Sequence, residues 1–201
     1  MKKIKYIIVI AVIAFTLNNK VSAQETYINI TYDMAIPLGN TADFISKTSF
    51  RGYTFEFGWF LNDNLAIDLR WGWQTFYEDL PYDSYYEDTR TLTGKQYRYI
   101  NSMPITAGLK YFLNPNGSGH FVPYIGAGLG TYMQNVRTDM GIYTVEIKQW
   151  HFGFYPEVGF VYEFTYGTGF MLNARYDYTL DAGGNNGHSY LTFGVGFHFS
   201  L

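Results

Sequence analysis

The sequence predicts an all-β fold, an eight-stranded antiparallel up-and-down transmembrane β-barrel. Large apolar residues alternate with small or polar residues over eight separate segments, which is the two-residue period of a β-strand. The smaller face of these segments is rich in glycine, with 21 Gly in a chain of 201 residues. The connections are alternately long and short, as expected of a membrane barrel with short turns at one end and longer loops at the other.

The final segment, Ser189–Leu201, shows the pattern most clearly. Every second residue from Leu191 to Leu201 is large and apolar, whereas the residues between them are mostly small or polar. A strand with two such unlike faces separates an apolar surface from a polar one.

The other segments repeat this alternation in order along the chain. The predicted strands cover residues 26–36, 50–61, 65 to about 76, 97–113, 121–133, 149–163, 170–180 and 189–201. The predicted connections are short at 62–64, 114–119 and 165–168, long and polar at 37–49, 77–95 and 134–148, and intermediate at 181–188. Pro104 and Pro156 fall inside predicted strands, and because proline lacks the backbone donor we expect local irregularity at both.

The volume of the barrel determines which face points outward. The apolar faces carry roughly forty large side chains, whereas the interior of an eight-stranded barrel is only just wide enough for a single filling of side chains. The apolar faces also carry no Asp, Glu, Lys or Arg, and a Lys or Arg facing lipid at the midplane would cost about 2–4 kcal/mol. The apolar side chains are therefore predicted to face lipid; a soluble, aromatic-rich β-protein is the alternative.

Residues 1–23 have the features of a cleaved export signal. Lys2, Lys3 and Lys5 precede an apolar run of about 12 residues, too short for a membrane-spanning helix of roughly 20, and Val21-Ser-Ala23 provides the small residues of a cleavage site. We therefore expect a signal peptide over 1–23 and one barrel domain over 24–201. Cleavage would remove four of the 14 Lys and Arg and leave ten against 17 acids, a net charge of −7. Such an acidic chain does not favour nucleic acid as a partner, and the absence of Cys excludes disulfides and thiolate metal sites.

Two adjoining segments resemble a known family. Val122–Tyr132 contains a Pro-Tyr-x-Gly-x-Gly-x-Gly pattern, and Met103–Phe112 looks like the strand that usually precedes it. With these segments, the whole of 24–201 resembles the small outer-membrane β-barrels of Gram-negative bacteria, of the OmpX, OmpA membrane-domain and OmpW type, in the style of Bacteroidetes. The resemblance implies a monomer in the cell outer membrane, with lipid and the outer-membrane assembly machinery as partners. That machinery usually reads an aromatic C-terminal residue, whereas this chain has Leu201 at its end and Phe199 two residues earlier.

The predicted lumen contains charged side chains near mid-height. Charges in a narrow, dry lumen must pair, because an unpaired buried ion is very costly. We therefore expect a network of carboxylates and cations that either fills and rigidifies the barrel or opens as a gate by exchange of partners. The predicted members are Glu56, Arg70, Glu157 and Arg175, flanked by Asp68, Lys110, Glu163 and Asp177.

No catalytic, metal or cofactor site is predicted. Gly126, Gly128 and Gly130 alternate within a strand and lack the helix that a nucleotide-binding glycine loop requires, so we expect them to make room for bulky lumen groups such as Tyr124 and Tyr132. No two of the four histidines have zinc-ligand spacing. A triad of His188, Ser189 and Asp181 is conceivable, but adjacent strand positions point apart, so the chain is not predicted to be an enzyme.

The Tyr77–Lys95 connection is the second candidate site. Its tyrosines are interleaved with five acids, and aromatic residues suit protein interfaces, although a solvated loop tip has the same composition. The candidate contact residues are Tyr77, Tyr82, Tyr85 and Tyr86. The favoured function is a structural or interaction role, with external loops for adhesion or contact with an extracellular partner. A channel for small or apolar solutes and a soluble ligand-binding barrel are the alternatives.

Overall fold

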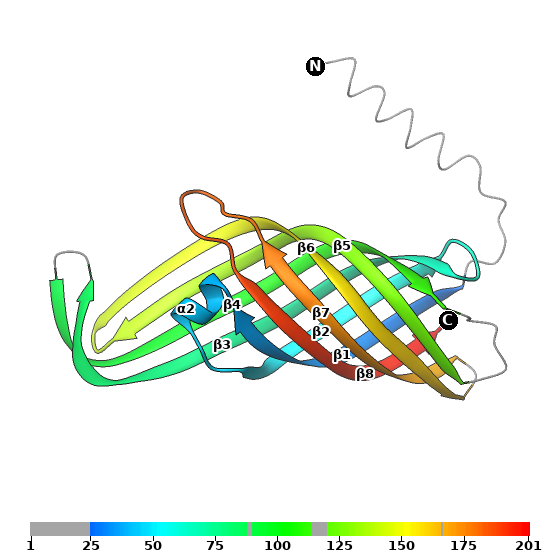
Figure 1. Ribbon diagram of the computed structural model, residues 1–201, viewed down its shortest axis with the longest axis horizontal. Helices are drawn as coiled ribbons and strands as arrows, with labels where there is room; N and C mark the ends of the chain where they lie inside the picture. Colours follow the sequence, from blue (N-terminus) through cyan, green and yellow to red (C-terminus); the bar gives the residue numbers. More distant parts are fainter. Residues whose placement is uncertain (1–24, 88–89, 114–119, 166) are drawn as a thin grey trace, which may run out of the picture.

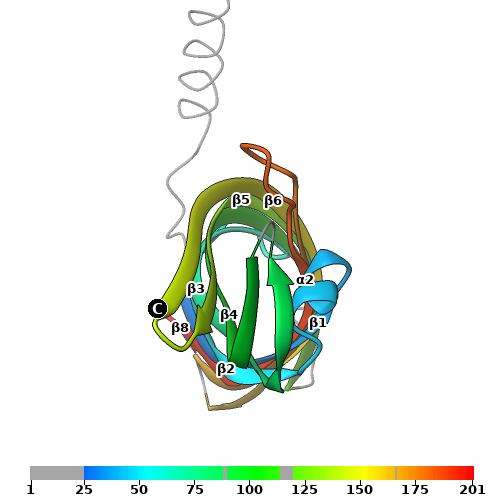
Figure 2. The same cartoon turned by 90° about the vertical axis from the view of Figure 1, so that its left-hand side faces the viewer.

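The computed structural model describes residues 25–87, 90–113, 120–165 and 167–201. Over these residues the chain forms eight antiparallel strands, each paired with its neighbours in sequence, and pairing of β1 with β8 closes the barrel (Figures 1 and 2). The fold class predicted from the sequence is confirmed. The strands are β1 (Thr26–Leu38), β2 (Ser49–Phe60), β3 (Leu65–Glu87), β4 (Arg90–Phe112), β5 (Phe121–Met140), β6 (Tyr143–Thr165), β7 (Thr168–Thr179) and β8 (Ser189–Ser200). The predicted signal peptide, residues 1–23, lies outside the described residues.

The two predicted proline irregularities are confirmed, and both leave the strand register intact. Between β3 and β4 the pairing passes from Trp71↔Ile105 to Gln74↔Ser102, so that the ladder is interrupted beside Pro104. Between β6 and β7 it is interrupted in the same way beside Pro156. Each proline keeps its place in the ladder on its other side, with β5. The missing donor is therefore absorbed by a short gap in one ladder.

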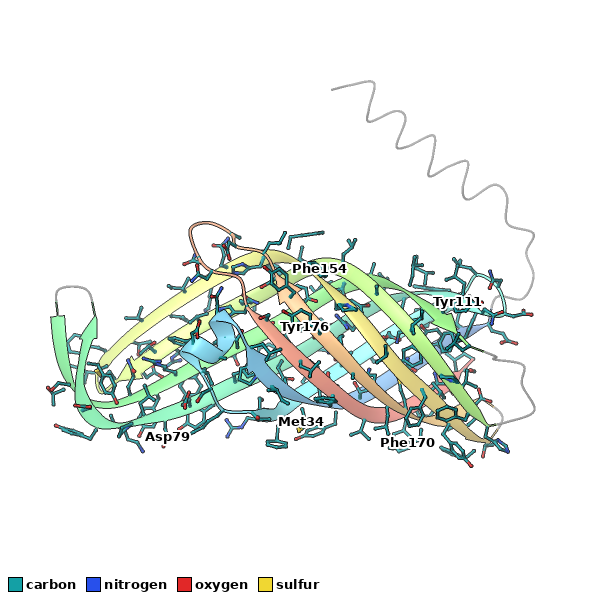
Figure 3. All side chains as sticks on the ribbon, in the orientation of Figure 1. Met34, Asp79, Tyr111, Phe154, Phe170 and Tyr176 are labelled. Carbon is teal, nitrogen blue, oxygen red and sulfur yellow. The ribbon has the colours of Figure 1, made fainter. Side chains whose placement is uncertain are left out.

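Alternate side chains along each strand point outward and into the lumen, as the sequence predicts. On β2, Phe55 is 40% exposed whereas its neighbour Glu56 is 2% exposed, and on β3, Leu69 is 54% exposed whereas Arg70 is 2% exposed. Figure 3 shows Tyr111, Phe154 and Phe170 on the outside of the ribbon. Closure pairs the strand edges, which is what the absence of water in a bilayer requires. The alternative of a soluble barrel with an apolar interior is therefore wrong.

Two of the three long connections predicted from the sequence are wrong, because the strands continue through them. β3 and β4 pair as far as Glu87↔Arg90, across the predicted 77–95 loop. β5 and β6 pair as far as Met140↔Tyr143, across the predicted 134–148 connection. Pairing of β4 with β5 continues to Gln96↔Met140, so the four strands form one sheet that extends beyond the barrel, at the left of Figure 1. We call the parts of β3–β6 beyond the barrel, residues 77–87, 90–99, 135–140 and 143–149, the projecting sheet.

The exposure of β6 shows where the sheet leaves the barrel. Every residue from Tyr143 to Lys148 is exposed, whereas from His151 onwards exposed and buried residues alternate. Thr26 and Leu201 are hydrogen-bonded to each other at the opposite end, with the short turns. Since membrane barrels place short turns on the periplasmic side, the projecting sheet lies on the external side.

A short helix, α2 (Asn40–Phe44), lies in the connection between β1 and β2, beside the rim of the external mouth (Figure 2). Its anchor is Ile45, which is fully buried with Ala35, Phe76 and Tyr190. None of the helices in the described part of the chain has the length and apolar character to cross a bilayer.

Candidate functional site

A continuous chain of ion pairs crosses the lumen at mid-height. Lys110 Nζ lies 2.6 Å from Glu56 Oε1 and 3.2 Å from Glu157 Oε1. Arg70 pairs with Glu157 at 3.8 Å and with Asp177 at 3.2 Å. All five side chains are at most 2% exposed. They come from β2, β4, β6, β3 and β7, so the network links strands on different sides of the barrel.

Arg175 extends this chain to β1. It contacts Asp177 at 2.9 Å and Asp33 at 3.3 Å, with Glu157 at 4.0 Å. Asp33 also accepts hydrogen bonds from Thr31 at 2.7 Å and Thr54 at 2.5 Å. Alternation alone assigns Asp33 to the lumen face, but Asp33 is not among the predicted members of the network.

The eight predicted lumen residues do not all join this network. Six of them, together with Asp33, form the ion pairs, and we call these seven residues the lumen network: Asp33, Glu56, Arg70, Lys110, Glu157, Arg175 and Asp177. Asp68 is fully buried beside the network and accepts a hydrogen bond from Tyr155 at 3.3 Å. Glu163 is only half-buried, pairs with Gly169 near the periplasmic turn, and has no ion pair in the described part of the chain. The alternation of residues gives the face of a strand but not the height along it, which is why Glu163 was misplaced.

Four buried tyrosines fill the space around the charges. Tyr124 donates to Glu157 at 2.7 Å and Tyr132 donates to Asp177 at 2.9 Å. The Arg70 guanidinium lies 3.5 Å from the ring centre of Tyr155, a cation–π contact. Tyr27 packs against Phe60 and Phe112 nearer the periplasmic end. Aromatic and charged groups therefore occupy the lumen together.

The glycines of the polar faces provide the room for these rings. A Cβ on Gly159 would lie 2.6 Å from the Tyr124 hydroxyl, and one on Gly153 would lie 2.8 Å from the Tyr132 ring. A Cβ on Gly128 would lie 2.5 Å from the Tyr155 ring, and one on Gly126 would lie 3.1 Å from Lys110. Gly126 and Gly128 thus make room for bulky lumen groups as predicted, but for Lys110 and Tyr155 instead of Tyr124 and Tyr132. The prediction is wrong for Gly130, where a Cβ would lie against the Ile105 carbonyl oxygen and 2.6 Å from Thr106 Cα.

The second predicted site, the tyrosine-rich segment, lies on the projecting sheet. Tyr77 is packed there, with its ring 5.0 Å from that of Tyr99, whereas Tyr82 is 75% exposed. Tyr85 is half-buried and donates to the Pro81 carbonyl at 2.5 Å. Tyr86 belongs to β3, but its side chain is outside the described part of the chain. Of the three described tyrosines, only Tyr82 presents most of its surface to a partner.

Lys47 ties this sheet to the rim, and Lys95 pairs with the same carboxylate within the sheet. Asp79 accepts from Lys47 of the β1–β2 connection at 2.7 Å and lies 3.4 Å from Lys95 of β4. The hydrogen bond from Lys47 lowers the pKa of the Asp79 carboxyl below its ordinary value. The start of the projecting sheet is therefore held against the β1–β2 connection by charge.

The side chains of the conceivable triad are not hydrogen-bonded to one another in the described structure. His188 Nδ1 lies 3.2 Å from Thr41 Oγ1, Ser189 Oγ donates to the Leu38 carbonyl, and Asp181 accepts from the Gly187 amide. Within the described residues, no three His, Cys, Asp or Glu side chains are grouped so as to hold a metal ion. The three side chains of the conceivable triad are therefore each hydrogen-bonded to other partners in the described structure.

The fold and the lumen define a class, the small outer-membrane barrels. The family model of the outer membrane protein beta-barrel domain matches residues 7–199, so the chain belongs to this family and is an integral protein of the outer membrane. No curated protein matches the sequence.

Several solved outer-membrane barrels share the fold at low identity. Neisserial surface protein A is 16% identical, with a TM-score of 0.58 over 91% of this chain and all of that one. OprG of Pseudomonas aeruginosa is 15% identical, with a TM-score of 0.56 over 89% of this chain and 96% of that one. Ail, the attachment invasion locus protein of Yersinia pestis, solved with a heparin analogue, is 11% identical, with a TM-score of 0.53 over 90% of this chain and all of that one. At such identities the likeness extends to the fold alone.

Proposed function

We propose that the barrel is closed to solutes and acts at its outer surface, where the projecting sheet contacts another surface or protein. The observation that carries this proposal is the lumen network, whose seven members are each at most 3% exposed and link six of the eight strands. The remaining two strands, β5 and β8, are joined to it by hydrogen bonds from Tyr132 and Thr192 to Asp177. The network occupies the path that a solute would take.

Opening the barrel would be costly. A solute passing at this height would have to separate buried cations from buried carboxylates, and breaking one such pair costs about 3–5 kcal/mol. Arg70, Lys110 and Arg175 each contact at least two carboxylates, so that no single pair can be released alone. The filling role is therefore favoured over a gate that opens by exchange of partners.

The projecting sheet offers the contact surface. Tyr82 and Tyr143 are 75% and 52% exposed, and Ile142, at the turn between β5 and β6, is 92% exposed. Large apolar side chains exposed together on the water-facing part of a protein mark interaction sites. The similarity in fold to Ail, whose name refers to attachment, agrees with an adhesive role.

Conductance across planar bilayers tests the closed lumen. The intact protein should leave the conductance at background, under conditions in which an open porin gives discrete steps. Arg70→Ala or Arg175→Ala should also stay at background, because the tyrosine rings still fill the lumen. Stepwise conductance in the intact protein would overturn the closed barrel, and steps that appear only in these variants would favour the gate.

Adherence of whole bacteria tests the projecting sheet. Cells that produce Tyr82→Ser, Ile142→Ser and Tyr143→Ser together should adhere less to a monolayer of cultured cells than cells that produce the unchanged protein. The matched control is Leu61→Ser, an exposed apolar residue at the periplasmic turn, which should adhere normally. Equal adherence of the triple variant, at equal surface level, would refute the proposal.

The runner-up function, transport of small or apolar solutes, predicts swelling of proteoliposomes in sugar solutions. The lumen argues against an apolar route, because it is lined by charges. Swelling at the rate of an open porin would nevertheless favour transport over the closed barrel.

A further inference from the structure

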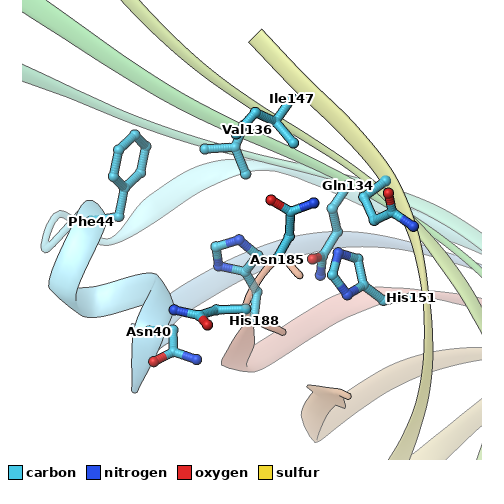
Figure 4. Close-up of a pocket in the computed structure, with 10 residues that line it drawn as sticks. Asn40, Phe44, Gln134, Val136, Ile147, His151, Asn185 and His188 are labelled. Carbon is cyan, nitrogen blue, oxygen red and sulfur yellow. The ribbon is translucent and has the colours of Figure 1, made fainter. Parts of the chain in front are cut away.

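A pocket of about 190 Å3 lies at the external mouth, above the lumen network. Four separate segments meet there: α2, β5, β6 and the β7–β8 connection (Figure 4). Its polar lining consists mainly of carboxamides, from Asn40, Gln134, Gln149, Asn185 and Asn186. The pocket is separate from Tyr82, Ile142 and Tyr143, so it stands independently of the adhesive surface proposed above.

One of these amides has an unpartnered atom. Gln134 is 1% exposed, and its Oε1 has no hydrogen-bond partner in the described structure. Its Nε2 donates to Thr179 Oγ1 at 3.2 Å, which fixes the amide plane. A buried carbonyl oxygen without a partner costs free energy, and a ligand hydroxyl in the pocket would satisfy it.

The other lining groups are held in place by their own contacts. Asn185 closes a tight turn with Ala182 in which Gly183 and Gly184 both have positive φ, 60° and 81°, as a type I′ turn requires. His151 Nδ1 lies 2.9 Å from the Leu180 carbonyl and donates to it, which fixes the orientation of the ring. Such pre-organisation reduces the entropy lost when a ligand binds.

The pocket combines this polar lining with apolar surface and contains no Asp, Glu, Lys or Arg. Phe44, Val136 and Ile147 line one side, as Figure 4 shows. The Arg98 guanidinium carbon lies 4.9 Å from the centre of the Phe44 ring, a cation–π contact. The lining therefore offers an ionic ligand neither a carboxylate nor an ammonium or guanidinium group as a partner.

We propose that this pocket binds one neutral sugar residue. A carboxamide both donates and accepts hydrogen bonds, as does a sugar hydroxyl. Several amides around one ring can therefore pair with the donors and the acceptors of its hydroxyls. The apolar side offers Phe44, Val136 and Ile147 to the C–H face of the ring. The volume of about 190 Å3 is below the range of roughly 300–1,000 Å3 that drug-sized ligands need, so the pocket accepts a single ring of a glycan instead of a longer chain.

Saturation-transfer NMR on the folded full-length barrel tests this inference. Amine-oxide micelles are required, because maltoside and glucoside detergents carry sugar head groups that would compete. The probes are the methyl glycosides of glucose, galactose and mannose, N-acetylglucosamine, and glucuronate as the charged counterpart. At least one neutral sugar should give a saturable signal, and glucuronate should bind at least about tenfold more weakly because the pocket has no Lys or Arg to pair with its carboxylate.

Matched variants assign the signal to the pocket. Gln134→Met keeps the shape, removes the amide and should weaken binding by about tenfold. Gln74→Met is the control, since Gln74 is similarly buried, at 4% exposed, but lies outside the pocket and is hydrogen-bonded to Ser49. If Gln134→Met does not fold, Asn185→Ala in the β7–β8 connection takes its place, with the same expected loss. Absence of binding by every neutral sugar, equal binding of glucuronate, or unchanged binding in the folded pocket variant would overturn the inference.

Discussion

Removal of the Lys110 charge is the sharpest test of the lumen network. Lys110 contacts two carboxylates, Glu56 at 2.6 Å and Glu157 at 3.2 Å. In Lys110→Met, Glu157 keeps Arg70 and Arg175 within 4.0 Å and the hydrogen bond from Tyr124. Glu56 is therefore the carboxylate that is left without an ion-pair partner in the described structure, and it accounts for most of the lost stability.

Glu56 has Lys110 as its ion-pair partner in the described structure and otherwise accepts only from Asn29, at 2.7 Å. Because an uncompensated buried charge costs about 3–5 kcal/mol, Lys110→Met should destabilise the barrel by about that amount. Glu56→Gln alone leaves Lys110 with Glu157 and should cost less, about 1–2 kcal/mol. Glu56→Gln combined with Lys110→Met should recover most of the loss, so that the two changes are strongly non-additive.

Urea titration in phospholipid vesicles measures these differences. The four tryptophans report on the state of the barrel by fluorescence; Trp71 and Trp150, for example, are 41% and 52% exposed on the lipid face. The unfolding midpoint of Lys110→Met should fall and that of the double variant should return towards the unchanged protein. If Lys110→Met unfolds at the same urea concentration as the unchanged protein, or if the two losses simply add, the pairing of Lys110 with Glu56 does not stabilise the barrel.

Three further predictions concern the lumen, the lipid face and the external mouth. Gly128→Ala brings a Cβ within 2.5 Å of a buried tyrosine ring and should lower the urea midpoint, whereas Gly94→Ala, with its nearest neighbour atom at 3.8 Å, should not. Leu129→Arg places a charge on the lipid face and should cost about 2–4 kcal/mol by the same titration, whereas Val145→Arg on the projecting sheet should cost almost nothing. Burial, and the neighbouring His151 to a smaller extent, lowers the pKa of His188 to about 4. Unfolding lets this imidazole take up a proton between pH 6.5 and 4, so stability should fall by about 3 kcal/mol as the pH drops through that window, and His188→Gln should flatten this part of the pH profile.

The sequence predicts the part of the fold that lipid constrains. Inside the bilayer one face of each strand must be apolar, so alternation identified all eight strands and the lumen position of residues such as Glu56 and Arg70. Beyond the bilayer both faces meet water, and the alternation loses its contrast. From Tyr143 to Lys148 every side chain is exposed, which is why a polar connection was predicted where β6 continues. The β-branched Thr144, Val145 and Ile147 were the signal that remained there.

The candidate sites, too, are predictable from the sequence only in part. Which side chains enter the lumen depends on alternation within one strand, and this the sequence contains. Which of them meet depends on the stagger between strands, so that the membership of Asp33 and the exclusion of Glu163 required the structure. The mouth pocket was not predicted at all, because Asn40 and His188 are 148 positions apart and become neighbours only when β8 closes on β1.

The buried charges inside the barrel determine the strand register as well as contributing to stability. Five buried carboxylates, Asp33, Glu56, Asp68, Glu157 and Asp177, face three buried cations, Arg70, Lys110 and Arg175. A barrel selected only for stability would carry fewer buried charges, since apolar groups of equal size often stabilise as well or better. In this barrel, however, the lipid face of each strand is already apolar. If the lumen face were apolar too, the two faces would be alike and either could face the lipid. The charges therefore also fix which face enters the lumen, because a slip of one residue in register would turn Glu56 and Arg70 towards lipid.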